Sequence, residues 1–336
     1  MENISKQKLL DLTEGGKNMS EQKLLNLTND YIFKRTFGYT GSGNITKILL
    51  RDILQDNISE VQLDNQTITE KELMDDKVGI MDIRAVLNRN TECDIEMQVV
   101  NQHNIEKRIL FYLAKMYTKS IKEGNNYNNL KKSICVLFAD FKLDGLHEVE
   151  KYITKWNIRE EEYKNIILTD VLELVIIELP KYFKYRKKEK RENLNLWLKF
   201  LKNPEVSIMV NENDSQEIKE TKRAINKAQA KLEEISRNEH ERYLAELREK
   251  YIRDQVAVQE YGYIKGREEG KAEGIEEGRK EGMEEGRKKG ELNSKKAIAQ
   301  KLLTDGMDAE TVAKITELTL DEVKSIDNEK IPKKSS

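Results

Sequence analysis

The sequence has little of the residue types on which many enzymes depend. Only three histidines are present, His103, His147 and His240, so histidine-centred catalysis and histidine-rich metal sites have little material. The two cysteines, Cys93 and Cys135, lie in apolar, strand-like stretches without CxxC spacing. This indicates reduced core thiols and neither a disulfide framework nor a zinc site. Any chemistry must therefore come from carboxylates.

Long apolar runs are also absent. The sequence has no stretch of about 18 apolar residues, and its first residues lack the basic-then-apolar layout of a signal peptide. We therefore expect a cytoplasmic protein that does not enter a membrane.

The overall charge is nearly balanced, with 59 basic and 61 acidic residues. Contact with nucleic acid would therefore need a local cluster of cations. Residues 181–191, KYFKYRKKEKR, form such a cluster, although a charge run is more often a solvated helix face. The candidates for DNA contact in this run are Lys181, Lys184, Arg186, Lys187 and Lys188.

Changes in composition divide the chain into five segments. The first, residues 1–28, carries a short tandem repeat (SKQKLLDLT and SEQKLLNLT), and Met19 is a candidate for the true start. The others are an α/β core over residues 29–204, a long charged helix over 205–261, a glycine repeat over 262–290 and a small helical module over 294–328.

Within the core segment the apolar periodicity switches between helix and strand. Two amphipathic helices are expected between residues 29 and 54, and a core-facing helix is expected over residues 105–121. Strands separated by helices favour an α/β fold with a mixed or parallel central sheet flanked by helices. The expected strands are residues 80–87, 92–100, 133–140 and 171–179.

Eight glycines recur at every fourth position from Gly262 to Gly290, separated almost entirely by Glu, Lys and Arg. On a helix they would form a slowly winding stripe, and charges four residues apart can pair. Each glycine costs a helix about 0.8–1.0 kcal/mol relative to alanine. We expect either a helix whose stripe lets another backbone approach, hence a homo-oligomer through the C-terminal helices, or a mobile tether.

The last segment gives three short helical signals. They lie around residues 297–303, 308–315 and 319–326, with Asp308 and Thr319 as candidate N-caps. This layout is compatible with a helix-turn-helix, and a small bundle that mediates assembly is the alternative.

The segment with the most specific chemistry is residues 81–100, MDIRAVLNRNTECDIEMQVV. On its second strand acidic and polar residues alternate with apolar ones, which an ordinary half-solvated strand would also show. That interpretation does not account for Asp82 at the start of the first strand, within reach of Glu96 or Gln98 in a closed hairpin. Asp82, Glu96 and the Met97 carbonyl would offer hard oxygen ligands to Mg²⁺, as in a phosphodiester-cleaving site.

Several stretches in order resemble one family over nearly the whole chain from about Leu27. The chain is similar to the Rpn family of recombination-promoting nucleases and related transposases, a branch of the PD-(D/E)XK superfamily. The resemblance is carried by NDYIFKRTFG (29–38), DDKVGIMDIRA (75–85), DIEMQ (94–98), the stretch 108–141, ELPK (178–181) and the glycine repeat.

The resemblance implies a restriction-endonuclease-like core and Mg²⁺-dependent cleavage of DNA. Asp82 and Glu96 take the places of the metal-binding residues, and Gln98 stands where the superfamily usually has lysine. Asp30 matches an acidic residue of the first helix, although an N-cap role is the alternative. Lys77 could approach the phosphate backbone or form a surface ion pair.

Two other functions remain open at this stage. Gln98 can only hydrogen-bond where lysine would add charge, so a nuclease-derived binding or assembly protein without activity is the main alternative. The long helical half also fits an oligomerisation scaffold, but the α/β half would then have no purpose.

Overall fold

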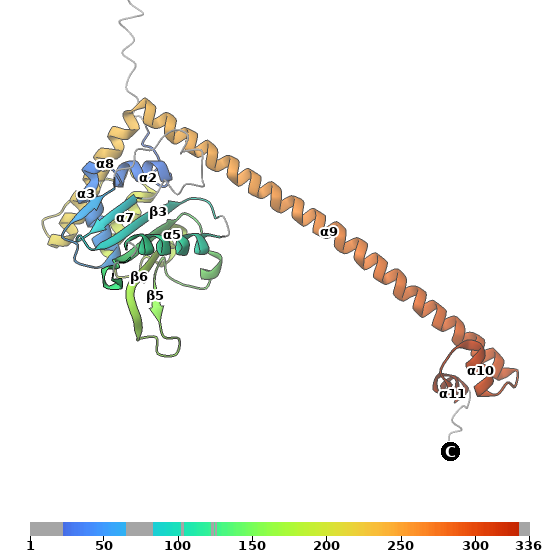
Figure 1. The fold of residues 1–336 in the computed structure, drawn as a ribbon. Helices are drawn as coiled ribbons and strands as arrows, with labels where there is room; N and C mark the ends of the chain where they lie inside the picture. The colour runs from blue at the N-terminus through green and yellow to red at the C-terminus, as the bar shows by residue number, and fades with distance from the viewer. Residues whose placement is uncertain (1–22, 65–82, 102–103, 122–123, 125, 329–336) are drawn as a thin grey trace, which may run out of the picture. The chain divides into compact units, whose positions relative to one another are not determined.

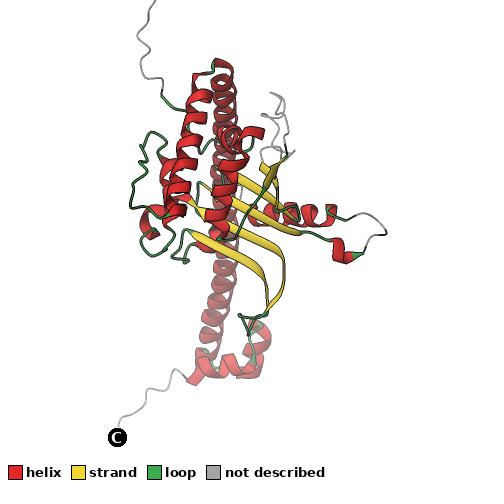
Figure 2. Cartoon of the chain, turned by 90° about the vertical axis from the view of Figure 1, so that its left-hand side faces the viewer, coloured by secondary structure: helices red, strands yellow, loops and turns green. Residues whose placement is uncertain are grey.

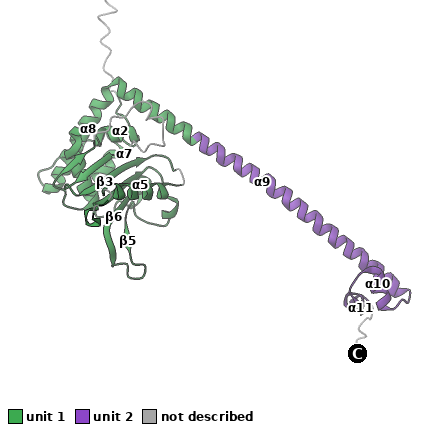
Figure 3. Cartoon of the chain, viewed as in Figure 1, with its two compact units in different colours: residues 1–256 green, residues 257–336 purple. Residues whose placement is uncertain are grey.

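The structure is a computed structural model that describes residues 23–64, 83–101, 104–121, 124 and 126–328 (Figure 1). The chain divides into two compact units, residues 1–256 and residues 257–336 (Figure 3). Across the described ranges, every helix is too short or too polar to span a lipid bilayer.

The first unit is built on a mixed six-stranded sheet with the order β1-β2-β3-β4-β6-β5 (Figure 2). The first three strands are antiparallel, β4 runs parallel to β3 and β6 runs parallel to β4, and β5 is antiparallel to β6. This confirms the predicted α/β fold with a mixed sheet. The strands are β1 (Val61–Leu63), β2 (Ile83–Leu87), β3 (Thr91–Gln98), β4 (Lys132–Ala139), β5 (Ile153–Arg159) and β6 (Ile167–Glu178).

Four helices cover one face of this sheet. They bury a large core in which Phe33 stacks near Phe138 with ring centroids 5.3 Å apart, and Trp197 is fully buried. These helices are α2 (Asp30–Phe37), α3 (Gly43–Leu54), α7 (Glu192–Lys202) and α8 (Gln216–Arg237).

Of the described helices, α5 (Ile105–Lys119) covers the opposite face. Its apolar stripe, Ile105, Ile109 and Leu113, packs on Leu137 of β4 and Ile176 of β6 in a separate, smaller core. The predicted helix over residues 105–121 is therefore confirmed. Because the two cores lie on opposite faces and side chains alternate along a strand, odd-numbered residues of β3 face one core and even-numbered residues face the other.

The hairpin between β2 and β3 sets the register of the two strands and so determines which side chains share a face. Its turn places Asn88 and Arg89 at φ 48° and 68°, a left-handed pair that suits the twist of a tight hairpin. The resulting register sets Leu87 opposite Thr91 and Ile83 opposite Ile95.

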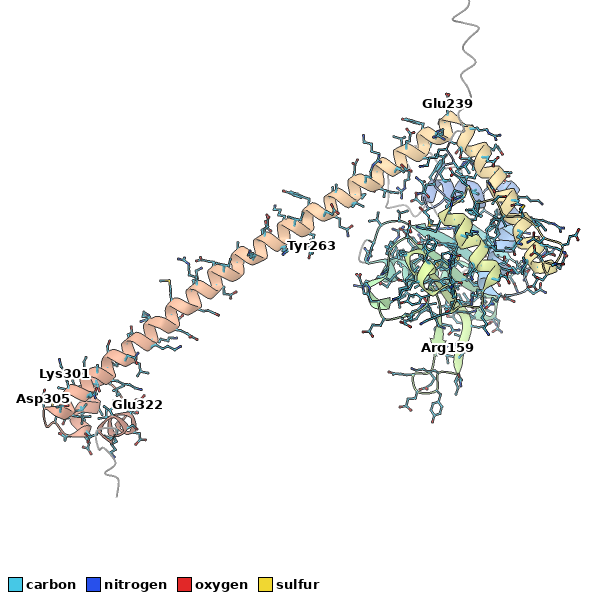
Figure 4. All side chains as sticks on the ribbon, turned by 180° about the vertical axis from the view of Figure 1, so that it is seen from behind. Arg159, Glu239, Tyr263, Lys301, Asp305 and Glu322 are labelled. Atoms are coloured by element: carbon cyan, nitrogen blue, oxygen red, sulfur yellow. The ribbon has the colours of Figure 1, made fainter. Side chains whose placement is uncertain are left out.

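The β5–β6 hairpin projects from the body of the first unit, with Arg159 at the end of β5 (Figures 1 and 4). Its pairing shifts register between Trp156 and Ile158 and again between Ile158 and Arg159. Beyond β6 the chain forms α6 (Leu179–Tyr185), and three 3-10 turns occupy loops elsewhere. These turns are η1 (Thr40–Ser42), η3 (Tyr127–Asn129) and η4 (Asp144–Leu146).

The prediction of one continuous charged helix over residues 205–261 is wrong. The chain breaks at Asn238, which has extended backbone angles of φ −84° and ψ 117°. Its side-chain oxygen accepts hydrogen bonds from the amides of His240 (2.9 Å) and Glu241 (3.2 Å), so it starts a new helix. That helix, α9 (Glu239–Thr304), then runs through the whole glycine repeat.

The glycine repeat is helical, and its surroundings are open. A Cβ atom added at any position from Gly262 to Gly290 would meet no described atom within 4 Å outside its own local helix backbone. The predicted charge pairing is confirmed, for example by Glu284–Lys288 at 2.8 Å. Tyr263, on the same stretch, is 71% exposed (Figure 4). Within the described part of this chain, no other backbone therefore packs closely against the glycine stripe.

The second unit ends in three short helical pieces. The last turns of α9 pack with α10 (Ala309–Thr316) and α11 (Leu320–Asn328) around Ala299, Val312 and Val323. Both predicted caps are confirmed. Asp308 accepts from the Thr311 amide at 2.9 Å, and Thr319 accepts from the Glu322 amide at 3.3 Å.

Candidate metal centre on strand β3

Strand β3 places its acidic residues against α5. Cys93, Ile95 and Met97 enter the large core, so Asp94 and Glu96 point to the other face of the sheet. There Asp94 lies opposite Cys135 and Glu96 opposite Leu137 in the parallel register with β4. Asp94 is 5% exposed and Glu96 is 1% exposed. The half-solvated strand is therefore excluded as the explanation of the polar alternation.

Three oxygens of these buried carboxylates have no hydrogen-bond partner among the described residues. Both side-chain oxygens of Glu96 and the Oδ1 atom of Asp94 are inaccessible to solvent, and no described residue bonds to them. Most buried polar atoms in folded proteins are hydrogen-bonded, so three bare oxygens on one strand need an explanation. Hard anionic oxygens in this state suit a divalent cation such as Mg²⁺.

Burial changes the ionisation of Asp94. Desolvation raises the pKa of the Asp94 carboxyl to about 7, and the neighbouring charge of Glu96 adds to the rise. Arg84, Lys34 and Arg108 act in the opposite direction. The acidic pair is therefore held in a dry site with cationic side chains around it.

Gln98 and Met97 complete the end of the strand. The backbone carbonyl of Gln98 accepts from the Asp140 amide at 2.8 Å, on the β4 side. Consecutive carbonyls of a strand point to opposite neighbours, so the Met97 carbonyl points toward the β2 side. Strand β2 begins at Ile83, opposite Ile95, and the described part of β2 has no residue opposite Met97. The Gln98 side chain is half-buried.

Two of the predicted site residues, Asp82 and Lys77, lie outside the described residues. Of the predicted metal site the structure describes Glu96, Met97 and Gln98, which are successive residues at the end of β3. Among the described residues, no group of three or more His, Cys, Asp or Glu side chains could hold a metal ion.

Asp30 is engaged elsewhere. Its carboxylate receives the guanidinium of Arg248 from α9, with Nη2 and Oδ2 2.6 Å apart and both side chains 7% exposed. The N-cap of α2 is Asn29, whose side-chain oxygen accepts from the Ile32 amide, so the N-cap alternative for Asp30 is wrong. With Arg248 on its carboxylate, Asp30 serves the packing of α9 on α2.

The basic run around α6 divides into a buried part and an exposed part. Lys181 is 3% exposed and pairs with Glu178 at 2.7 Å, so it has no surface for a phosphate and does not join a DNA-contacting set. Lys184, Arg186, Lys187 and Lys188 are exposed, and Lys188 pairs with Glu150.

A cavity of about 470 Å³ opens beside Asp94, between α5 and strands β1 to β3. Arg84, Lys115 and Lys119 line it together with Tyr112. This cavity could not be predicted from the sequence, because its walls come from separate segments. The helical spacing of Tyr112, Lys115 and Lys119 was the only local signal that these side chains share one side of α5.

Comparison with known families gives two matches along the chain. The model of the PD-(D/E)XK nuclease family transposases matches residues 27–262, which is more than half of the sequence. The model of the C-terminal HTH domain of the Rpn/YhgA-like nuclease family matches residues 293–327, the three helical pieces of the second unit. Searches of curated proteins and of solved structures give no match. The chain therefore belongs to the PD-(D/E)XK nuclease family transposases and carries an Rpn/YhgA-like C-terminal helix-turn-helix domain.

Proposed function

We propose that the protein is a Mg²⁺-dependent DNA endonuclease with its metal centre at the end of β3. The observation that carries the proposal is the carboxylate of Glu96. This side chain is 1% exposed and receives no hydrogen bond from any described residue. An unpaired buried charge is costly, and a bound cation is the usual compensation.

The ligand set we propose is Glu96, Asp82 and the Met97 carbonyl. Ile83 and Ile95 are paired in the register, and the chain neighbours of this pair are Asp82 and Glu96. In such a site Mg²⁺ supplies activation of water for attack on phosphorus and neutralisation of negative charge on the phosphate. The protein's part is to hold the two carboxylates and to keep the site dry with α5.

Gln98 would act as a neutral hydrogen-bonding group toward the attacking water or the phosphate. An amide donates and accepts hydrogen bonds but adds no charge, unlike lysine. This departure favours the second candidate, a nuclease-fold protein that binds DNA with weak or no cleavage. The two functions differ in one measurable property, phosphodiester cleavage.

Nicking of supercoiled plasmid separates them. We expect the full-length protein to nick with Mg²⁺ and to stop when EDTA is added. Glu96→Gln and Asp82→Asn should each lose on the order of 10²-fold or more in rate, while Glu106→Gln, an exposed acid on α5, should match the wild type. Equal nicking by all four proteins would remove support for this site. DNA binding without nicking by the wild type would favour the second candidate.

We further propose DNA contact through the exposed cations of the α6 region, Lys184, Arg186 and Lys187, and through the helix-turn-helix domain. Lys77 remains a candidate. Because the glycine stripe of α9 has no neighbour within this chain, as far as it is described, we also propose that it is where two copies associate.

A further inference from the structure

The cavity beside Asp94 has the features of a ligand site. Its volume of about 470 Å³ lies within the range of roughly 300–1,000 Å³ that is usual for small-molecule pockets. It includes Asp94, two residues from Glu96 on β3, and extends from there toward the β2–β3 turn, under the second half of α5.

Three cations line this cavity. Arg84 lies directly opposite Asp94 across the β2–β3 pair, so both side chains emerge on the α5 face. Lys115 and Lys119 are one helical turn apart on α5 and are exposed. Among the described residues none forms an ion pair with these three side chains, whereas the lining acid Glu92 is compensated by Lys131 at 3.2 Å. Asp64 is the remaining acid at the rim.

The inner wall has a different character. Val86 and Met116 give it apolar surface, and Tyr112, half-buried, offers an aromatic ring. Asp94 also lines the cavity, but it is 5% exposed and its Oδ1 atom is not accessible to solvent, so the wall offers little polar surface there. Cations together with an aromatic ring match two parts of a nucleotide, which are a phosphate and a stacking base.

We propose that this cavity binds one unpaired nucleotide of the DNA strand next to the cleavage site. This site rests on the proposed function, because it assumes that DNA is the substrate. It would recognise the strand outside the metal centre. Arg84, Lys115 and Lys119 contact the phosphate, and Tyr112 stacks on the base. Duplex ends, nicks or melted segments are then the preferred substrates, since they supply an unpaired base without an unstacking cost.

The test measures binding without Mg²⁺, in EDTA, so that cleavage plays no part. Anisotropy of a labelled thymidine oligomer gives the affinity of the full-length protein between 50 and 200 mM salt. Lys115→Ala combined with Lys119→Ala should weaken binding about tenfold and reduce the slope of log affinity against log salt by up to about 0.7, the value for one phosphate contact on single strands. Lys107→Ala is the matched control, because Lys107 is exposed on the same helix but does not line the cavity.

A second arm tests the base. The wild type should prefer the thymidine oligomer about tenfold over an oligomer of the same length without bases. Tyr112→Leu should lose that preference, and Tyr112→Phe should keep it because the ring remains. If the lysine double variant behaves like Lys107→Ala, or if Tyr112→Leu keeps the preference, the proposal is overturned.

These results are independent of the plasmid assay. A wild type that binds as expected but does not nick would refute the endonuclease while leaving the nucleotide site intact. A wild type that nicks through Glu96 while the cavity variants bind normally would refute the nucleotide site alone.

Discussion

Arg248 on α9 and Asp30 on α2 form a buried, forked ion pair across 218 positions of sequence. Arg248 Nε lies 3.0 and 2.9 Å from the two carboxylate oxygens, and Nη2 lies 2.6 Å from Oδ2. Nearby, Glu241 of α9 receives Arg35 and the Tyr31 hydroxyl from α2. The first turns of α9 are therefore part of the first unit's core, although most of this helix is exposed.

Removing Arg248 should destabilise the first unit. Arg248→Ala leaves the Asp30 carboxylate buried without its cation, and losses of this kind amount to about 3–5 kcal/mol. Urea unfolding of the full-length protein would measure it. The double variant Arg248→Met with Asp30→Asn removes both charges and should recover most of the loss. A double variant as unstable as Arg248→Ala would mean that the contribution is packing and not charge.

Asp94 should make the apoprotein less stable as pH rises. In the unfolded chain the Asp94 carboxyl ionises near its ordinary pKa of 3.8, whereas in the fold its pKa is about 7. The folded state therefore retains a proton that the unfolded state has lost between these values, and stability falls with pH until about 7.

Asp94→Asn lacks this dependence, so its advantage over the wild type should grow between pH 5 and pH 8. We expect a gain on the order of 2 kcal/mol, measured by urea unfolding in EDTA. Asp170→Asn, at a side chain 79% exposed, is the control and should track the wild type. A constant difference in unfolding free energy between Asp94→Asn and the wild type from pH 5 to pH 8 would contradict a raised pKa of the buried Asp94 carboxyl.

Gln98 should limit the rate of DNA cleavage. Gln98→Ala removes a neutral hydrogen bond of about 1 kcal/mol, so nicking should fall about tenfold or less. Gln98→Lys restores a cation at a half-buried position and should raise the rate above that of the wild type. Plasmid nicking at fixed Mg²⁺ would show it. A slower Gln98→Lys variant would indicate that the amide has a role which charge does not replace.

Alanine in the glycine stripe should distinguish an open helix from one that packs against a second copy. Gly270→Ala, Gly274→Ala and Gly278→Ala meet no described atom within 4 Å, so each should stabilise the helix by about 0.8–1.0 kcal/mol if the stripe faces solvent. If two copies approach along the stripe, the added methyl groups should instead lower the mass measured by light scattering. Unchanged mass together with a more stable helix would contradict association through the stripe.

The sequence predicted those parts of the fold in which local periodicity and packing agree. The two-residue period of β3 assigned Cys93, Ile95 and Met97 to one face and the acids to the other, as the structure confirms. The stripe on α5 and the apolar runs of β4 and β6 were equally clear, because each is buried along its length.

Other parts depended on contacts that a local pattern does not contain. Strand β1 has only three residues, and β5 is largely exposed and lacks a continuous apolar run, so neither produced a strand signal. The burial of Asp94 follows from the position of α5 over β3 and not from its neighbours in sequence. Likewise, Asp30 could not be separated from an active-site acid until Arg248, far along the chain, was in place.

The register shifts of β5 also bear on how readily the open edge of the sheet pairs with a foreign strand. This strand is the outermost of the described strands on its side of the sheet, where free amides and carbonyls could recruit a foreign strand. Two pairing irregularities near Ile158 twist this edge strand. Lys155 and Arg159 add positive charge to it. The exposed Trp156 and Ile158 are thus carried on a strand that is a poor template for fibril-like growth.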